Sequence, residues 1–332
     1  MTTAVRVVVV TYSPGETLGR FLSSLRSATS ASYEVVLADN GSGDGEPQRA
    51  AGADPEHVRF LSTGGNVGYG AAANVGAEGA LDVWLVVANP DIEWSPGSLD
   101  RLLDAGERWP RAGALGPLIR TPDGALYPSA RSFPSLGRGV GHALFGWWWP
   151  TNPWTASYRR ERGKPVEGTT GWLSGSCMLL RREAFEAVGG FDPSYFMYFE
   201  DLDLCERLAR AGWQSVYVPS ALVTHVGGHS TSRVSDRMQR AHHRSAYQYL
   251  SRRYRGAHLA PLRLALAVGL VGRYLLSRAV GRVREGAQPT RRLADAQVTG
   301  THVTEPPLPP GRGAGAGRPP TETHPPDPHT RD

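Results

Sequence analysis

Cysteine is scarce in this chain of 332 residues, which has only Cys177 and Cys205, both in apolar surroundings. Two such cysteines offer neither a disulfide framework nor the clustered spacing of a metal knuckle. We expect each to be a small core residue. A secretory signal peptide is missing too, because the first apolar run is short and leads straight into Thr11-Tyr12-Ser13-Pro14. The chain is therefore expected to stay in a reducing cytoplasm.

Lysine is nearly absent, with Lys164 alone against 35 arginines. No lysine stands in the turn Thr11-Tyr12-Ser13-Pro14-Gly15, where a nucleotidyltransferase would usually carry a basic, Gly-rich phosphate loop. Residues 1–251 have a net charge of −2, whereas a nucleic-acid binder more often shows a basic stripe on its folded domain. No nucleic-acid partner is expected.

A long uncharged apolar run is also lacking. The apolar stretch at residues 259–283 is interrupted by arginine, and its longest uncharged part, residues 264–272, is too short to span a bilayer. On a helical wheel its four arginines fall within about half of the circumference; they are Arg263, Arg273, Arg278 and Arg282. This pattern is typical of a helix lying in a membrane interface. An amphipathic helix docked on its own domain is the alternative.

Charge and composition divide the chain into three parts. Residues 252–292 hold ten arginines and one acid, Glu285, a net charge of +9. Residues 301–332 contain nine prolines and few apolar groups, which is typical of disorder. We predict a folded domain at 1–255, a basic amphipathic membrane-associating helical segment at 256–285, and a disordered Pro/Gly-rich tail at 286–332.

Strand and helix patterns alternate through the first 90 residues. The β-branched runs at 5–12, 33–39, 58–61 and 83–88 predict buried strands, and the periodicity of the segments from Leu18 and from Ala71 predicts helices. Such alternation indicates an α/β fold with a mostly parallel, doubly wound sheet. Ligands bind at the carboxyl ends of the strands in these sheets. We therefore expect Asp39, the loop at Asn66 and Asp91 along one edge.

Three acids in four residues follow the aromatic run Phe196–Phe199: Glu200, Asp201 and Asp203. Leu202, Leu208 and Ala209 are spaced for the buried face of a helix that Gly212 would end. Acids suit the first turn of a helix because of its dipole, but capping requires only one. Three acids beside aromatic residues indicate instead a carboxylate tuned for acid–base chemistry.

Several motifs occur in one order, and together they identify a family. They are Val9-Val10-Thr11-Tyr12, Ala38-Asp39-Asn40-Gly41-Ser42, Asn66-Val67-Gly68-Tyr69-Gly70, Asn89-Pro90-Asp91, Gly175-Ser176-Cys177-Met178-Leu179, Gly189-Gly190-Phe191-Asp192 and Phe199-Glu200-Asp201-Leu202-Asp203. From about Val5 to His229 the chain resembles the inverting glycosyltransferases of family 2. More narrowly, it resembles actinobacterial rhamnosyltransferases that act on lipid-diphosphate-linked sugars.

This resemblance implies a GT-A fold: a Rossmann-like nucleotide-binding half with a mostly parallel mixed sheet, followed here by C-terminal helices. The implied donor is a nucleotide sugar, in the narrower case dTDP-rhamnose. The implied acceptor is a polyprenyl-diphosphate-linked sugar, and with the basic segment this places the enzyme at the inner face of the cell membrane. The donor-binding residues it implies are Thr11, Tyr12, Asp39, Asn66, Gly68, Asn74 and Asp91.

Two of these assignments have a structural alternative. Asp39 would bind the nucleotide, although it could instead shape the Asp-Asn-Gly turn. Asn89-Pro90-Asp91 takes the place of the family's Asp-x-Asp metal motif without its first acid. Asp91 would then be the one carboxylate there for Mg²⁺ or Mn²⁺, with diphosphate oxygens completing the shell. Its alternative role is to cap a helix beginning near Ser95.

The catalytic assignment follows the family's Glu-Asp motif. Asp201 would be the base and Glu200 would assist it, although neighbouring acids share their titration. His225, rather than His229, would complete the metal shell, with a buried structural histidine as the alternative. Arg233 fits either a phosphate contact or the surface. The tryptophans of the insertion at about 133–168, Trp147–Trp149 and Trp154, fit either sugar contacts or core filling.

Two other functions are compatible with parts of the pattern. A nucleotidyltransferase also uses a Rossmann-like half with acidic metal sites. A membrane-tethered nucleotide-sugar sensor would have lost the catalytic acids, whereas Asp91 and Asp201 are both present.

Overall fold

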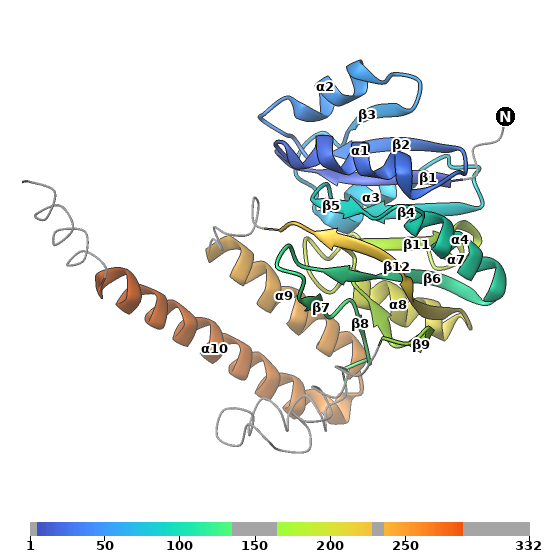
Figure 1. Cartoon of the computed structure of the whole chain (residues 1–332). Helices are drawn as coiled ribbons and strands as arrows, with labels where there is room; N and C mark the ends of the chain where they lie inside the picture. The colour runs from blue at the N-terminus through green and yellow to red at the C-terminus, as the bar shows by residue number, and fades with distance from the viewer. Residues whose placement is uncertain (1–4, 135–164, 228–235, 288–332) are drawn as a thin grey trace, which may run out of the picture. The chain divides into compact units, whose positions relative to one another are not determined.

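The computed structural model of the chain describes residues 5–134, 165–227 and 236–287 (Figure 1). The predictions for Trp147–Trp149, Trp154, His229, Arg233 and the tail beyond residue 287 lie outside these ranges. In chain order the elements are β1 (Val5–Thr11), α1 (Thr17–Ala28), β2 (Tyr33–Asp39), α2 (Glu46–Ala53), β3 (Val58–Ser62), α3 (Tyr69–Ala77), β4 (Trp84–Ala88), β5 (Ile92–Trp94), α4 (Ser98–Arg108), β6 (Ala112–Arg120), β7 (Leu126–Tyr127), β8 (Ala130–Arg131), β9 (Gly168–Thr170), β10 (Trp172–Leu173), β11 (Cys177–Arg181), α7 (Arg182–Ala187), α8 (Glu200–Arg210), β12 (Gln214–His225), α9 (Asp236–Arg253), a 3₁₀ turn (Ala257–Leu259) and α10 (Ala260–Ala287).

A mixed sheet forms the centre of the domain, with the strand order β3-β2-β1-β4-β11-β6-β12-β5. Its first four strands are parallel, as the alternating pattern predicts. β11 runs antiparallel between β4 and β6, and β5 runs antiparallel to β12. A separate two-stranded sheet consists of β8 and β10. The expected Rossmann-like half and mostly parallel mixed sheet are confirmed.

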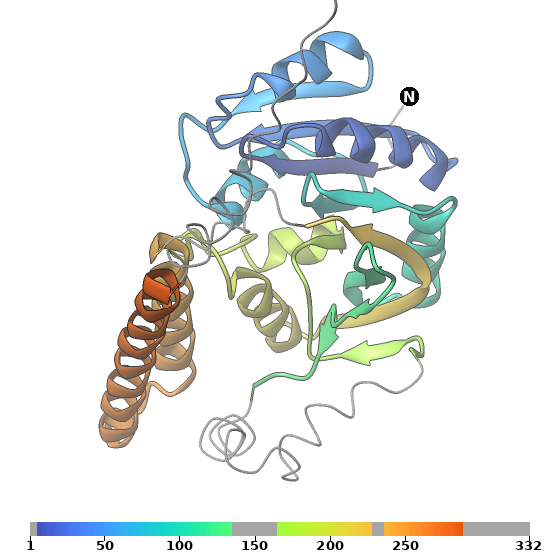
Figure 2. The same ribbon diagram turned by 60° about the vertical axis from the view of Figure 1, so that its left-hand side comes forward.

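Helices cover both faces of this sheet (Figures 1 and 2). Val5, Val7 and Val9 of β1 pack with the buried sides of α1 and α4. Val8 and Val10 point to the other face, where α3, α7 and α8 pack. A strand buried on both sides needs apolar residues at every position, which explains its continuous valine run. Both cysteines are buried core residues, as expected.

Helix α8 begins at Glu200, directly after the aromatic run. Leu202 and Leu208 are buried as the spacing predicts, but Ala209 is exposed, so that part of the prediction is wrong. Leu204 and Cys205 complete the buried face instead, because the helix packs between the large sheet and the strand pair β8–β10. The chain leaves the helix through Gly212, whose φ of 87° favours glycine.

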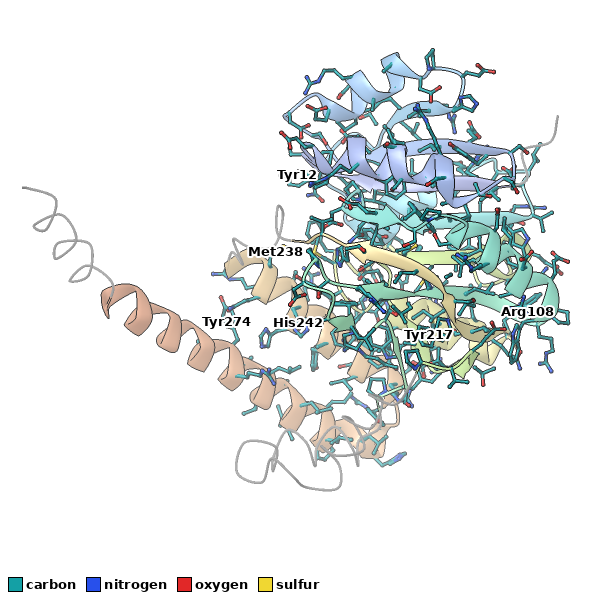
Figure 3. The ribbon with its side chains drawn as sticks, in the orientation of Figure 1. Tyr12, Arg108, Tyr217, Met238, His242 and Tyr274 are labelled. Carbon is teal, nitrogen blue, oxygen red and sulfur yellow. The ribbon has the colours of Figure 1, made fainter. Side chains whose placement is uncertain are left out.

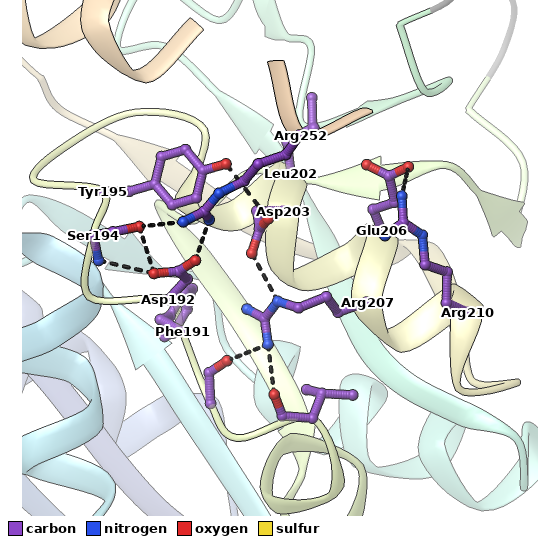
Figure 4. A network of polar contacts seen from close by, with 12 residues as sticks. Phe191, Asp192, Ser194, Tyr195, Leu202, Asp203, Glu206, Arg207, Arg210 and Arg252 are labelled. Carbon is purple, nitrogen blue, oxygen red and sulfur yellow. Dashed lines mark hydrogen bonds and ion pairs between the residues drawn. The ribbon is translucent and has the colours of Figure 1, made fainter. Parts of the chain in front are cut away.

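Helix α9 is fastened to the segment that precedes α8 (Figure 4). Arg252 of α9 pairs with Asp192, and Arg253 Nη1 lies 2.6 Å from Glu206 Oε1. Ser245 Oγ donates to the Met197 carbonyl at 2.9 Å, and the Tyr249 ring packs beside Phe199. These contacts fix α9 to the first turns of α8 and to the segment that leads into it.

Helix α10 contacts α9 through Tyr274. The Tyr274 hydroxyl accepts a hydrogen bond from Arg240 Nε at 2.7 Å, and its ring lies edge-on to His243 (Figure 3). Among the described residues, no helix is both long and apolar enough to cross a membrane.

Candidate active site

The ends of the four parallel strands bring the first four motifs to one edge of the sheet. Thr11 lies opposite Asp39 in the β1–β2 register, Asp39 lies opposite Ser62 of β3, and Ala88 of β4 lies opposite Val9. The expected common edge is therefore present. Tyr12 follows β1 with 52% of its surface exposed, so its ring is accessible to a ligand at this edge (Figure 3).

Asp39 is only 2% exposed, and its carboxylate is fully used within the loop. Thr11 Oγ1 donates to Oδ1 at 2.7 Å, and the Ser42 hydroxyl donates to the same oxygen. The amides of Gly41 and Ser42 donate to Oδ2 at 3.1 and 2.9 Å. A carboxylate has about four acceptor positions, so the structure gives Asp39 the role of shaping the turn. Nucleotide contact by its side chain stays a prediction.

The loop at Asn66 is held by a neighbour that the motif analysis did not single out. Asn40 Oδ1 accepts from Thr63 Oγ1 and from the Val67 amide, and its Nδ2 donates to the Gly68 carbonyl. Asn66 is exposed, and its Oδ1 accepts from the Gly68 amide at 3.2 Å. The Asn66 amide nitrogen is thus placed at the ligand edge.

Gly68 is required by the packing of the protein itself, and its contact with the donor stays a prediction. Its φ is 95°, and a Cβ there would stand 2.3 Å from the Phe196 carbonyl oxygen. The adjacent Tyr69 amide donates to that same carbonyl at 3.0 Å. Gly68 therefore lets the Asn66 loop pack against the segment that leads into α8.

Asn74 likewise has a structural partner. Its Nδ2 donates to the Phe191 carbonyl at 2.7 Å, and its Oδ1 accepts from the Phe191 amide at 2.8 Å. These two hydrogen bonds fix α3 to the Gly189–Asp192 motif. The structure thus gives Asn74 a supporting role, and its contact with the donor stays a prediction.

Asp91 and His225 lie side by side, although 133 residues separate them. Ile92 pairs with His225 across β5 and β12, which places the Asp91 Oδ1 atom 3.1 Å from His225 Nε2. Strand β5 begins immediately after Asp91 and the next helix begins only at Ser98, so the helix-capping alternative is wrong. Both side chains are 18% exposed, and Tyr127 lies edge-on to the imidazole at 5.8 Å.

This pair suits a divalent cation. The Asp91 Oδ1 atom is buried and, despite its closeness to His225, has no partner with hydrogen-bond geometry within the described residues. An oxygen and a nitrogen ligand at such spacing can share one ion. No group of three or more potential ligands occurs in the described part of the chain.

The catalytic acids are placed by two unusual residues. Tyr198 and Phe199 both have φ of 68°, the left-handed region that costs non-glycine residues about 1–2 kcal/mol each. This conformation turns the chain sharply into α8. The His242 ring of α9 lies 5.3 and 5.6 Å from the Tyr198 and Phe199 rings, so tertiary packing stabilises the turn (Figure 3).

Asp201 and Glu200 stand in different environments. Asp201 is partly accessible, and its two oxygens accept from the Gly175 amide at 2.9 Å and the Leu202 amide at 2.8 Å. Glu200 is 6% exposed, and its Oε2 has no hydrogen-bond partner among the described residues. Amide donors favour a carboxylate, whereas an unsolvated oxygen disfavours it. The amide donors therefore favour ionisation of Asp201 over ionisation of Glu200.

The pKa shifts agree with this division. Burial, with a smaller contribution from the Asp201 charge, raises the pKa of Glu200 to about 8. Burial also raises the pKa of Asp201, but the Gly175 and Leu202 amides act in the opposite direction. Both carboxyl groups thus have raised pKa values, and as close neighbours they share their titration.

Tyr69 and Gly175 connect the parts of the site, and neither was among the predicted site residues. The Tyr69 hydroxyl donates to the Gly175 carbonyl at 2.5 Å, and the Gly175 amide bonds Asp201. Burial raises the pKa of Tyr69, and smaller contributions in the same direction come from Glu200, Cys177, Asp201 and Asp91. Both residues belong to quoted motifs, but only the fold gives them a common neighbour.

Comparison with known proteins identifies the family. Residues 6–189 match the model for glycosyl transferase family 2, and residues 158–248 match that for glycosyltransferase like family 2. The chain belongs to glycosyl transferase family 2. It is therefore an enzyme of the glycosyltransferase class, which confirms the resemblance drawn from the motifs.

Two relatives narrow the comparison. The N-acetylglucosaminyl-diphospho-decaprenol L-rhamnosyltransferase of Mycobacterium tuberculosis is 53% identical over 313 residues, which is 91% of this chain and 100% of the relative. Rhamnosyltransferase WbbL of Escherichia coli K12 is 28% identical over 260 residues, 75% of this chain and 93% of the relative.

Solved structures confirm the GT-A fold. The mannosyltransferase PcManGT from Pyrobaculum calidifontis, in complex with GDP-Man and Mn²⁺, has a TM-score of 0.53 at 17% identity and covers 89% of this chain and 84% of its own. GalNAc-T7 with UDP, GalNAc and Mn²⁺ gives 0.52 at 18% identity, covering 68% of this chain and 44% of its own. At such identity the likeness concerns the fold alone.

The raised pKa of Glu200 predicts a pH-dependent gain in stability for Glu200→Gln. An acid whose pKa is higher in the folded protein than in the unfolded chain lowers the free energy of unfolding as pH rises from about 4.5 to about 8. Glutamine removes this penalty. We expect the melting temperature of the variant to exceed that of the wild type by several degrees near pH 8, and the gain to vanish near pH 4.

Thermal unfolding at several pH values measures this difference. Glu183→Gln is the control, because Glu183 is an exposed acid in the first turn of α7, and its substitution should change the melting temperature little at any pH. A melting difference for Glu200→Gln that is the same at pH 4 and pH 8 would contradict the assignment of the proton to Glu200.

Proposed function

We propose that this enzyme transfers L-rhamnose, with inversion, from dTDP-rhamnose to a sugar carried on a lipid diphosphate in cell-wall or polysaccharide assembly. The observation that carries the proposal is the 53% identity over the whole length of the mycobacterial rhamnosyltransferase. The presence of Asp91 and Asp201 in one site favours a catalyst over a nucleotide-sugar sensor. Family membership disfavours a nucleotidyltransferase.

In this proposal Asp201 is the general base. Its ionised carboxylate, oriented by the Gly175 and Leu202 amides, takes the proton of the acceptor hydroxyl as the oxygen attacks the anomeric carbon of the donor. The bond from that carbon to the diphosphate breaks on the opposite face, which inverts its configuration. Glu200, protonated and buried, adds no second negative charge beside the attacking oxygen.

The donor would lie along the strand ends. The exposed Tyr12 ring is available to stack on the nucleobase, and Thr11, Asp39, Asn66 and Gly68 shape the loops around it. Asp91 and His225 would hold a Mg²⁺ or Mn²⁺ ion with the donor diphosphate. When bound, such an ion offsets the negative charge that develops on the leaving group.

Helix α10 supplies the surface for a membrane. Leu264, Val268, Val271 and Leu275 are 57–67% exposed and fall within about 60° of the helical wheel. They form an apolar stripe on the side of the helix that faces solvent. An apolar stripe in a segment of net charge +9 suits insertion into the interface of an anionic leaflet, at the inner face of the cell membrane.

Three arginines of the basic segment have partners within the protein. Arg252 and Arg253 pair with Asp192 and Glu206, and Arg263 Nη1 donates to the carbonyls of Tyr254 and Gly256 at 2.8 Å. The proposed attraction to anionic lipid would therefore come from Arg255, Arg273 and the arginines farther along the chain.

The first test concerns the base. Asp201→Asn should lower kcat by about 10²–10⁴-fold while leaving the dissociation constant of the donor nearly unchanged. Single-turnover transfer and calorimetric titration of the nucleotide sugar measure the two effects. Asp203→Asn is the control, since Asp203 occupies the same helical turn but bonds Arg207 at 2.7 Å. Equal losses in both variants would mean that the acids serve only the helix end.

The second test concerns the metal. A chelator should abolish transfer, and Asp91→Asn should weaken Mn²⁺ binding, measured calorimetrically with nucleoside diphosphate present, because one charged ligand is lost. Glu93→Gln changes a neighbouring acid that pairs with Arg20 and should leave Mn²⁺ binding intact. Full activity in excess chelator would refute the metal role of Asp91 and His225.

The third test concerns the stripe on α10. Val268→Glu should weaken binding to phosphatidylglycerol vesicles about tenfold or more. It removes a valine side chain that would insert into the lipid, and its carboxylate is repelled by the anionic headgroups. Co-sedimentation measures the bound fraction. Ala265→Glu adds the same charge at an exposed position outside the stripe and should have a smaller effect. Equal effects of both substitutions would indicate that charge alone governs binding.

A further inference from the structure

A cation beside the proposed base is left unassigned by the donor and metal sites. Arg131 lies in β8, where the antiparallel register sets it opposite Trp172 of β10. Its guanidinium carbon stands 5.3 Å from the centre of the indole ring, and its Nε donates to the Pro128 carbonyl at 3.0 Å. A cation–π contact and a backbone acceptor thus fix the position of this charge.

The strand pair β8–β10 adjoins the catalytic helix. Trp172 packs against the cluster that contains Leu202, the residue after Asp201, together with Phe199. Three residues beyond Trp172, the Gly175 amide bonds the Asp201 carboxylate. The base and the Arg131 guanidinium are accordingly held by the same short segment. Burial raises the pKa of Asp201, and the Arg131 charge is the smallest of the effects that oppose this rise.

Arg131 approaches Asp201 from a different element than the donor residues do. The donor site occupies the ends of β1, β2 and β4, and the Asp91–His225 pair joins β5 to β12, all in the large sheet. Arg131 belongs to the separate two-stranded sheet. A lipid-diphosphate acceptor brings a second diphosphate to the site, attached to the sugar whose hydroxyl must reach the base. Guanidinium groups bind phosphate oxygens in pairs.

We propose that Arg131 binds the diphosphate of the lipid-linked acceptor and so positions the acceptor sugar against Asp201. This rests on the proposed function for the identity of the acceptor. Arg131 is then a determinant of acceptor specificity: it favours a sugar bearing a diphosphate over a neutral glycoside of the same sugar.

The test compares two acceptors with Arg131→Met. One is N-acetylglucosaminyl-diphosphate on a short polyprenyl chain, and the other is the neutral octyl glycoside of N-acetylglucosamine. We expect the KM for the diphosphate acceptor to rise about 10–100-fold, the range for loss of a charged hydrogen-bond partner, with little change for the neutral acceptor and for the donor. Arg131→Lys should restore part of the loss, since it keeps the charge but not the paired donors.

Arg101→Met is the matched control. Arg101 also donates to a proline carbonyl, that of Pro96 at 3.0 Å, but it lies on the exposed face of α4. It should leave all three KM values as they are. An equal rise for both acceptors, a rise in the donor KM, or no change in Arg131→Met would each overturn the proposal.

Calorimetric binding of the diphosphate acceptor without donor separates this inference from the proposed function. Weaker binding by Arg131→Met than by the wild type would support the Arg131 site whichever sugar is transferred, and equal binding would overturn it. Absence of rhamnosyl transfer by the wild type to any acceptor would instead refute the proposed function alone.

Discussion

The site depends above all on the sharp entry into α8. Tyr198 and Phe199 adopt left-handed conformations that neither residue favours alone, and this turn sets Glu200 and Asp201 at the helix start. The energy needed to hold it comes from packing that is distant in sequence: His242 and Tyr249 of α9 contact the two rings, and the Gly68 loop receives the Phe196 carbonyl. The positions of Glu200 and Asp201 are thus fixed by α9 as much as by the nucleotide-binding half.

This arrangement explains why two adjacent acids can behave differently. Asp201 points to backbone amides and remains partly accessible, whereas Glu200 is enclosed against apolar neighbours with one oxygen unsatisfied. A buried polar atom without a hydrogen-bond partner lowers the free energy of unfolding, and such losses of stability are common at functional sites. In the proposed mechanism this difference leaves Asp201 as the acid that accepts a proton.

Helices α9 and α10 connect the site at the start of α8 with the surface proposed to contact the membrane. Arginines that the charge count would assign to lipid, Arg252 and Arg253, instead pair with Asp192 and Glu206 and fix α9 to the body. Only beyond them does α10 present exposed apolar residues. The first part of the basic segment therefore fastens α9 to the body, and only the second part is available for the proposed contact with lipid.

The sequence by itself determined the fold class and the motifs, because buried parallel strands need continuous β-branched runs and their ends need turn residues. The motifs in the sequence also predicted that Asp39, Asp91 and Asp201 belong to one glycosyltransferase site. Only the tertiary structure shows which contacts these residues make: Asn74 and Gly68 pack against Phe191 and Phe196, and β5–β12 pairing brings His225 to Asp91. The motifs contain Asn40 and Tyr69 but do not indicate their partners, and Arg131 lies in none of them. Their importance arises from contacts between strands and loops that lie far apart in the chain, and periodicity and spacing cannot encode such contacts.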